Sequence, residues 1–175
     1  MLVWVTGLSG TGKSSIAAHL RELGHWSVDA DDDGMSGWRS HETGELVPSP
    51  PVDQRPADWL DRFSWCIDVR RVEELRPRSD GRVVFLVGAV ENEAEVLALA
   101  DVVVCLVADA DTLGQRLTTR RTNDFGQAPG DIEAVLSWLG VYEERHVAIG
   151  AVMVDAAQRL PGVVAEVLAA ASGAP

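Results

Sequence analysis

Short, continuously apolar runs recur along the chain and are separated by longer segments of mixed polarity. Such runs are typical of strands that are buried on both faces, because neither face has to be polar. The sequence predicts five strands, at Leu2–Val5, His25–Asp29, Arg82–Val87, Asp101–Val107 and Ala151–Val154. Several of the residues that directly follow these runs are polar or glycine, which indicates that the chain turns there.

Between the runs, apolar residues return every three or four positions, which is the period of an amphipathic helix. The predicted helices span Ser14–Leu23, Asp58–Leu75, Glu91–Ala100, a segment from a cap at Asp109 to about Arg121, Asp131–Val147 and Pro161–Ala171. The apolar stripe of the second helix consists of Trp59, Phe63, Cys66, Val69 and Val72, and Pro77 is expected to end that helix.

Two segments carry neither pattern. Residues Asp31–Pro56 are polar and rich in glycine and proline, so we expect an irregular excursion or flap there. Residues Thr122–Gly130 are predicted to form a loop.

Buried strands that alternate with helices predict a parallel sheet that is covered on both faces. The expected fold class is therefore α/β, a three-layer α/β/α domain with a five-stranded parallel sheet that includes all of residues 1–175. No internal repeat or linker divides the sequence. Ligands of such sheets bind beyond the carboxyl ends of the strands, so the segments after the predicted strands form the candidate site.

The segment after the first strand carries the most specific motif. Residues 7–14 read Gly-Leu-Ser-Gly-Thr-Gly-Lys-Ser, which fits the phosphate-binding pattern G-x-x-x-x-G-K-[ST] in full. Backbone N–H groups at a helix N-terminus attract phosphate. We expect Lys13 to reach the β- and γ-phosphates and Ser14 to offer its hydroxyl to Mg²⁺. The predicted nucleotide-binding residues here are Gly7, Leu8, Ser9, Gly10, Thr11, Gly12, Lys13, Ser14 and Ser15.

Composition narrows the range of partners. The formal net charge of −12 disfavours a general nucleic-acid binder, which needs a basic surface. No apolar run approaches the roughly 18 residues that a membrane span requires, and the chain opens on a predicted core strand, so we expect a cytoplasmic protein without a membrane partner. Cys66 and Cys105 lie in separate apolar stretches, where two reduced, buried thiols are expected.

A second motif supports the phosphate-binding interpretation: residues 28–31 read Val-Asp-Ala-Asp. Together with residues 7–14 they resemble small P-loop kinases of the nucleoside-monophosphate-kinase superfamily, in particular shikimate, gluconate and adenylylsulfate kinases. The resemblance implies that Asp29 helps to organise Mg²⁺ and that Asp31 contacts a substrate hydroxyl and acts in catalysis. No aspartate ends the Arg82–Val87 strand, so Asp29 or Asp31 would have to supply the second magnesium-organising carboxylate of P-loop proteins.

Two later segments extend the resemblance. Residues 116–126 are similar to the helix-to-lid element of these kinases, which implies a short lid at 119–130 and catalytic roles for Arg116 and Arg120. Cations at a helix C-terminus are also common stabilisers. Residues 152–156 are similar to the last strand and the turn that cups adenine, which implies nucleotide contacts by Arg116, Asp155 and Ala156. Residues 120–126 also resemble those of uncharacterised actinobacterial P-loop kinase-like proteins.

The acceptor side is expected in residues 31–75, the flap and its following helix, and after the third strand. The candidate substrate contacts are Asp31, Trp38, Arg62, Gly88 and Asn92. Trp38 lies in the polar excursion, where a packed core is least expected, so it is a candidate aromatic platform. Gly88 falls where the family has a glycine-rich turn. Asn92 is equally suited to begin a helix.

These expectations favour a kinase that transfers the γ-phosphate of Mg·ATP to a hydroxyl of a small metabolite. Arginines near the acceptor side, Arg62 among them, leave open a nucleoside monophosphate kinase with a phosphate acceptor. A nucleotide-binding ATPase that is regulated by a protein partner is a third alternative. The sequence leaves the oligomeric state open between a monomer and a homodimer.

Overall fold

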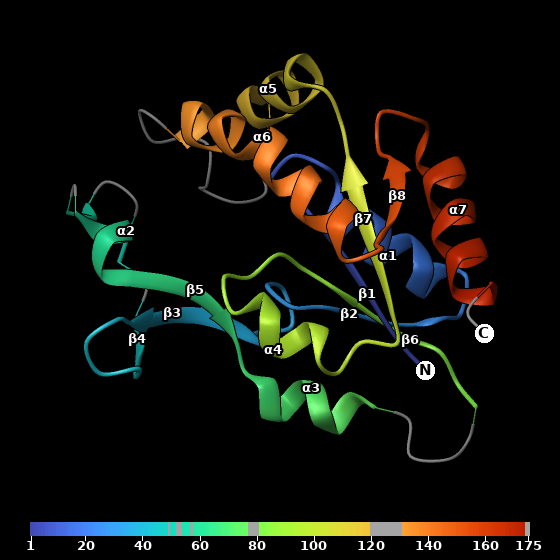
Figure 1. The fold of residues 1–175 in the computed structure, drawn as a ribbon, viewed down its shortest axis with the longest axis horizontal. Coiled ribbons are helices and arrows are strands. Elements are labelled where there is room, and N and C mark those ends of the chain that lie inside the picture. Colours follow the sequence, from blue (N-terminus) through green and yellow to red (C-terminus); the bar gives the residue numbers. More distant parts are fainter. Residues whose placement is uncertain (49, 52–53, 57, 77–80, 120–130, 174–175) are drawn as a thin grey trace.

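A computed structural model of the chain describes residues 1–175 apart from 49, 52–53, 57, 77–80, 120–130 and 174–175. Five parallel strands form the central sheet in the order β2-β6-β1-β7-β8 (Figure 1). The strands are β1 (Leu2–Gly7), β2 (Trp26–Asp29), β6 (Val84–Val87), β7 (Val102–Val107) and β8 (Val152–Asp155). The predicted five-stranded parallel sheet is confirmed, and every residue of β1, its central strand, is buried.

Helices cover both faces of this sheet, as the buried strands predict (Figure 1). On one face, α1 (Lys13–Glu22) and α7 (Leu160–Ser172) pack on residues such as Val3 and Phe85. On the other face, α3 (Val69–Leu75) and α4 (Glu93–Leu97) pack on residues such as Leu2 and Leu86.

Two further helices lie near the phosphate-binding segment. In α6 (Asp131–Ala148), Tyr142 makes a 2.7 Å hydroxyl–hydroxyl hydrogen bond with Thr6 at the end of β1. The helix α5 (Ala110–Thr119) begins after Asp109, whose Oδ1 accepts a 2.7 Å hydrogen bond from the Thr112 N–H. The predicted cap of that helix is therefore confirmed.

A second sheet was not predicted. A three-stranded antiparallel sheet, in the order β4-β3-β5, consists of the strands β3 (Ser36–Ser40), β4 (Leu46–Val47) and β5 (Phe63–Ile67). The expectation of an irregular excursion over 31–56 is therefore wrong for β3 and β4. Because Trp38 pairs directly with Trp65 across β3 and β5, this sheet brings distant residues together.

The predicted helix over Asp58–Leu75 is also wrong. A single turn, α2 (Trp59–Arg62), leads into β5, and only α3 returns to helix. The apolar residues of this stretch fit a helical spacing, but their pairing with β3 stabilises a strand instead. Short apolar segments are ambiguous in this way, because the tertiary surroundings decide which face is buried.

Some predictions fall on residues that the structure leaves undescribed. Pro77, Arg120 and the loop at 122–130 lie outside the described residues, as does the expected lid except for Thr119. Across the described parts of the chain, none of the helices combines the length and the apolar character needed to traverse a bilayer.

Candidate nucleotide and phosphoryl-transfer site

The turn after β1 is formed by glycines that other residues could not replace. Gly7 has a φ of 152°, and a Cβ there would lie 2.7 Å from the Leu106 carbonyl oxygen. Gly12 adopts the left-handed conformation (φ 90°) at the N-cap of α1, where no side chain caps the helix. The first N–H groups of α1 are therefore available for an anion.

These N–H groups open into a cavity of about 450 Å³ at the carboxyl end of the sheet. The cavity brings together four separate segments, namely the loop after β1, Asp31 after β2, Arg116 on α5 and the turn after β8. Its lining residues are Ser9, Gly10, Thr11, Gly12, Lys13, Ser14, Ser15, Ile16, Asp31, Arg116, Thr119, Ala156, Gln158, Leu160 and Val163. Most of the predicted loop residues thus line one cavity, whereas Gly7 and Leu8 are not part of its lining.

Lys13 curls over the loop. Its Nζ donates hydrogen bonds to the carbonyl oxygens of Gly7 (2.7 Å) and Leu8 (3.1 Å). The buried Thr11 hydroxyl also donates to the Leu8 carbonyl, at 2.8 Å, and braces the turn from inside. The ammonium group is thereby held at the mouth of the cavity where phosphate oxygens would enter.

Asp29 ends β2 with a buried carboxylate that is only 3% exposed. Its Oδ1 accepts backbone hydrogen bonds from Asp31 (3.0 Å) and Asp32 (3.2 Å). Its Oδ2 is also buried, and no residue within the described ranges offers it a hydrogen bond. A buried oxygen without a partner is costly, so this atom fits a bound cation or a cation-bound water.

Other carboxylates make the turn after β2 strongly electronegative. Asp33 accepts hydrogen bonds from the Asp29 N–H (2.9 Å) and from the Arg21 guanidinium, which anchors the turn to α1. Desolvation and the neighbouring carboxylates, Asp29 first among them, raise the pKa of Asp32. The turn therefore favours a cation over further negative charge.

These residues fit Mg²⁺, which is usually bound by one or two carboxylates or hydroxyls together with substrate phosphates. Ser14 lines the cavity, and Asp29 has the unpartnered oxygen. Among the residues that the structure describes, no group of three or more histidine, cysteine or acidic side chains is arranged so that it could hold a metal ion by itself. A site that depends on nucleotide phosphates does not require one.

On the opposite side of the cavity, Arg116 joins the loop to the turn after β8. Its guanidinium donates to the Ala156 carbonyl at 2.8 Å and to the Gly10 carbonyl at 3.4 Å. Asp155 is exposed, and its Oδ1 accepts the Ala157 N–H at 2.8 Å. Ala156 thus lines the cavity, whereas Asp155 shapes the turn beside it.

The predicted acceptor residues are distributed over several environments. Trp38 is 6% exposed and packs edge-on against Trp59 and Trp65, so it forms the core of the small sheet. The exposed Arg62 side chain lies 5.3 Å from the centroid of the Phe63 ring.

Gly88 and Asn92 connect the end of β6 to its neighbours. A Cβ on Gly88 would lie 2.7 Å from the Ala30 Cβ, so glycine allows the turn after β2 to approach. Asn92 exchanges two hydrogen bonds with the backbone of Ile67, at 2.9 and 3.1 Å, and holds β5 against the β6–α4 turn. Their roles toward a substrate stay predictions.

Four lining residues were not named as site residues from the sequence, namely Ile16, Gln158, Leu160 and Val163. Gln158 lies in the turn after β8, a position that the strand-end rule indicates only in general terms. Leu160 and Val163 belong to the first turn of α7, and apolar residues there carry no chemical signal that separates a cavity wall from core.

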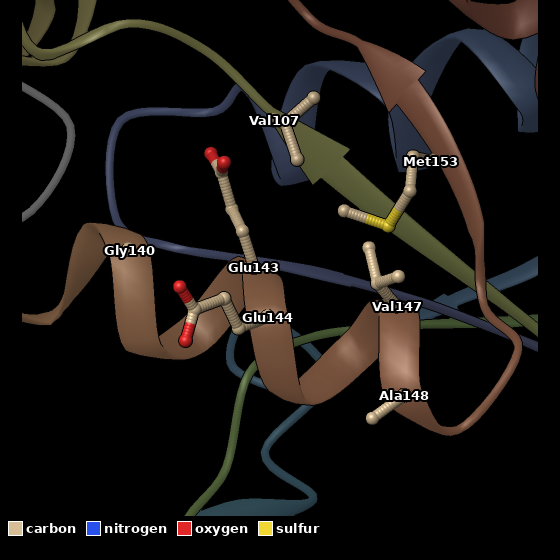
Figure 2. A pocket seen from close by; sticks show the side chains of 7 residues that line it. All are labelled: Val107, Gly140, Glu143, Glu144, Val147, Ala148 and Met153. Atoms are coloured by element: carbon tan, nitrogen blue, oxygen red, sulfur yellow. The ribbon is translucent and has the colours of Figure 1, made fainter.

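A hollow of about 590 Å³ lies elsewhere, between α6 and the ends of β7 and β8 (Figure 2). Val107, Val147 and Met153 provide an apolar lining, and Glu143 projects into the same space from α6. This hollow presents carboxylates where the cavity at the loop presents backbone N–H groups and Lys13. The chemistry therefore favours the cavity at the loop as the phosphate site.

Comparisons with known proteins agree with this geometry. The sequence of residues 3–135 matches the family described as the AAA domain. No curated protein matches the sequence.

Solved structures that are similar in fold include the following kinases. A gluconokinase from Sinorhizobium meliloti 1021 is 23% identical, with a TM-score of 0.56 over 97% of this chain and 90% of that one. A shikimate kinase from Acinetobacter baumannii, in complex with shikimate, is 17% identical, with a TM-score of 0.62 over 95% and 90%. A sugar kinase from Janibacter sp. HTCC2649 is 19% identical, with a TM-score of 0.53 over 99% and 95%.

Proposed function

The chain belongs to the AAA domain family, and from this premise we propose that it is an ATP-dependent phosphotransferase that moves the γ-phosphate of Mg·ATP to a hydroxyl of a small metabolite. The fold that it shares with kinases of gluconate, shikimate and sugars supports this assignment. The single observation that carries it is that Asp31 and Lys13 line one cavity. A carboxylate beside a phosphate-binding loop suits an acceptor hydroxyl, whereas it would repel an acceptor phosphate.

The loop and Arg116 would bind the donor. The N–H groups after Gly12 would donate hydrogen bonds to phosphate oxygens. Lys13 would give up its hydrogen bonds to the Gly7 and Leu8 carbonyls and bind the β- and γ-phosphates instead. Arg116 fixes the turn at Ala156 beside the base and presents its guanidinium to the cavity. Most of the catalysis is then positioning and charge neutralisation, as phosphoryl transfer requires. Arg120, Asp155, Trp38, Arg62, Gly88 and Asn92 remain proposed contacts.

Ser14 and Asp29 would hold Mg²⁺, Asp29 through a bound water. Bound Mg²⁺ would neutralise the charge that develops on the transferring phosphoryl group. Asp31 would accept a hydrogen bond from the acceptor hydroxyl and orient its oxygen toward the γ-phosphate. It would take the hydroxyl proton as the new P–O bond forms and the bond from the γ-phosphorus to the bridging oxygen breaks, which releases ADP.

A turnover assay tests the proposal. The full chain is incubated with Mg·ATP alone and then with D-gluconate, shikimate, a panel of hexoses and polyols, and a panel of nucleoside monophosphates, while ADP and phosphorylated product are quantified. We expect slow ADP formation alone and at least about tenfold stimulation by one hydroxyl compound. Stimulation by a nucleoside monophosphate, or by none of the small molecules, would contradict the assignment. The Lys13→Ala variant controls for a contaminating kinase.

A further inference from the structure

The indole of Trp65 contacts the carboxylate of Asp31 across the gap between the two sheets. Its Nε1–H donates a 2.9 Å hydrogen bond to Asp31 Oδ1. The two residues lie 34 positions apart, on the antiparallel strand β5 and on the turn after β2. This contact links the small sheet to a side chain that lines the phosphate cavity.

Three separate contacts fix the indole. Glu91 binds the Trp65 backbone from both sides, since its N–H donates to the Trp65 carbonyl (2.8 Å) and its Oε1 accepts the Trp65 N–H (3.0 Å). Trp38, the cross-strand partner, packs edge-on against the ring at 5.3 Å between centroids. The indole N–H is therefore aimed by a rigid scaffold.

The carboxylate is fixed at its other end by the backbone. The Asp31 N–H donates to Asp29 Oδ1 at 3.0 Å, so the buried carboxylate at the end of β2 fixes the position of the Asp31 backbone. Oδ1 is held by Trp65, and the exposed Asp31 side chain lines the phosphate cavity. Its Oδ2 is therefore the oxygen that would face a ligand in the cavity.

We propose that Trp65 is a positioning residue, which holds the Asp31 carboxylate in the orientation that receives the acceptor. The functional part of this inference rests on the proposed kinase activity, whereas the orientation itself does not. An aspartate on an exposed turn would otherwise sample several rotamers. A hydrogen bond to a charged group from a preorganised donor restricts it to one.

Two measurements test the orientation of Asp31 and its role in turnover separately. In the first, the six indole N–H signals of the full chain, labelled with ¹⁵N, are recorded by NMR, and the Trp65 signal is assigned by its loss in Trp65→Phe. We expect Asp31→Asn to shift this signal and to leave the exposed Trp26 signal in place. A Trp65 signal that does not respond to Asp31→Asn overturns the positioning role. The Trp38 signal is expected to move in Trp65→Phe because the two rings are in contact, whereas a retained signal from the buried Trp4 shows that the variants are folded.

The second measurement is Mg·ATP turnover with water as the acceptor. We expect Trp65→Phe to lower kcat about tenfold and to leave the KM for ATP within about twofold, since Trp65 does not line the nucleotide cavity. The matched control is Trp26→Phe, which should change neither constant. The double variant Trp65→Phe/Asp31→Asn should be no slower than Asp31→Asn alone, because both changes act through one carboxylate.

The outcomes distinguish the two proposals. Additive losses in the double variant would show that Trp65 acts by another route and would overturn the inference. An unchanged kcat in Asp31→Asn would reject the role of Asp31 in the proposed function, and the NMR result would then decide the orientation alone.

Discussion

Asp29 lies directly opposite Val87 in the parallel ladder between β2 and β6. In many P-loop proteins a carboxylate at the end of the strand beside the loop organises Mg²⁺, but β6 ends here at Val87 and is followed by Gly88. The register places the Asp29 carboxylate at the same edge of the sheet, one strand farther from the loop. We propose that Asp29, on this neighbouring strand, supplies the missing carboxylate.

Replacing Asp29 with asparagine should therefore weaken the response to Mg²⁺. The amide oxygen retains the hydrogen bonds from Asp31 and Asp32, so the turn should persist. Because carboxylates that act through bound water typically contribute 10–100-fold in metal affinity or activity, we expect a loss of about that size in turnover at limiting Mg²⁺. Turnover is measured against Mg²⁺ concentration at fixed ATP.

Asp68→Asn is the matched control. Asp68 also accepts a backbone hydrogen bond, from the Arg70 N–H at 3.1 Å, but it caps α3 and does not line the cavity. A Mg²⁺ dependence that changes equally in both variants would argue against a specific role for Asp29.

Lys13→Ala should lower turnover by about a thousandfold, which corresponds to roughly 4 kcal/mol of transition-state stabilisation. The ammonium group contacts two carbonyl oxygens of the loop, and an alanine side chain would place no positive charge at that position. Steady-state kinetics provide the test, with circular dichroism as the check of folding. Wild-type turnover in a folded variant would reject the assignment of the loop.

Gly88→Ala tests the close approach of the turn after β2. A new methyl group 2.7 Å from the Ala30 Cβ must displace one of the two backbones, so we expect a loss of about 1–3 kcal/mol in the free energy of unfolding and reduced turnover. Gly114→Ala is the control, because open space surrounds this glycine within α5. Alanine should stabilise that helix by up to about 1 kcal/mol. Urea unfolding of both variants measures the difference, and equal midpoints would disprove the steric argument.

The buried thiol of Cys105 should make the free energy of unfolding fall at alkaline pH. Burial, followed by the charge of Glu143, raises the pKa of its thiol from 9.0 to about 12. Above pH 9 the unfolded chain releases this proton and the folded chain keeps it. The contribution to stability is therefore complete below pH 9 and declines toward pH 12, by at most about 1.4 kcal/mol per pH unit.

The measurement is the urea midpoint of wild type and Cys105→Ala between pH 7 and pH 11. The two proteins should respond alike from pH 7 to pH 8, and the wild type should lose stability more steeply above pH 9. Parallel curves over the whole range would mean that the thiol is not shielded as its burial indicates.

The parts of the fold that could be predicted from the sequence are those that short-range patterns determine. The central strands are buried on both faces, so they appear as uninterrupted apolar runs. The loop at residues 7–14 is recognisable because its glycines are required by backbone geometry rather than by distant contacts.

The small sheet could not be found in this way. Trp59, Phe63 and Cys66 follow a helical spacing, and only the pairing of β5 with β3 makes a strand of part of that segment. The contact between Trp65 and Asp31 depends on this long-range pairing. For the same reason, Trp38 looked exposed in a polar stretch, although two other indoles bury it.

The most direct test of this account is a calorimetric titration of the folded, full-length chain with ATP in the presence of Mg²⁺. One nucleotide should bind per chain, and Lys13→Ala should weaken that binding. If the wild-type protein gives no binding heat and no thermal stabilisation with ATP or any other nucleoside triphosphate, the cavity at the loop is not a phosphate-donor site and the proposed phosphotransferase activity is wrong.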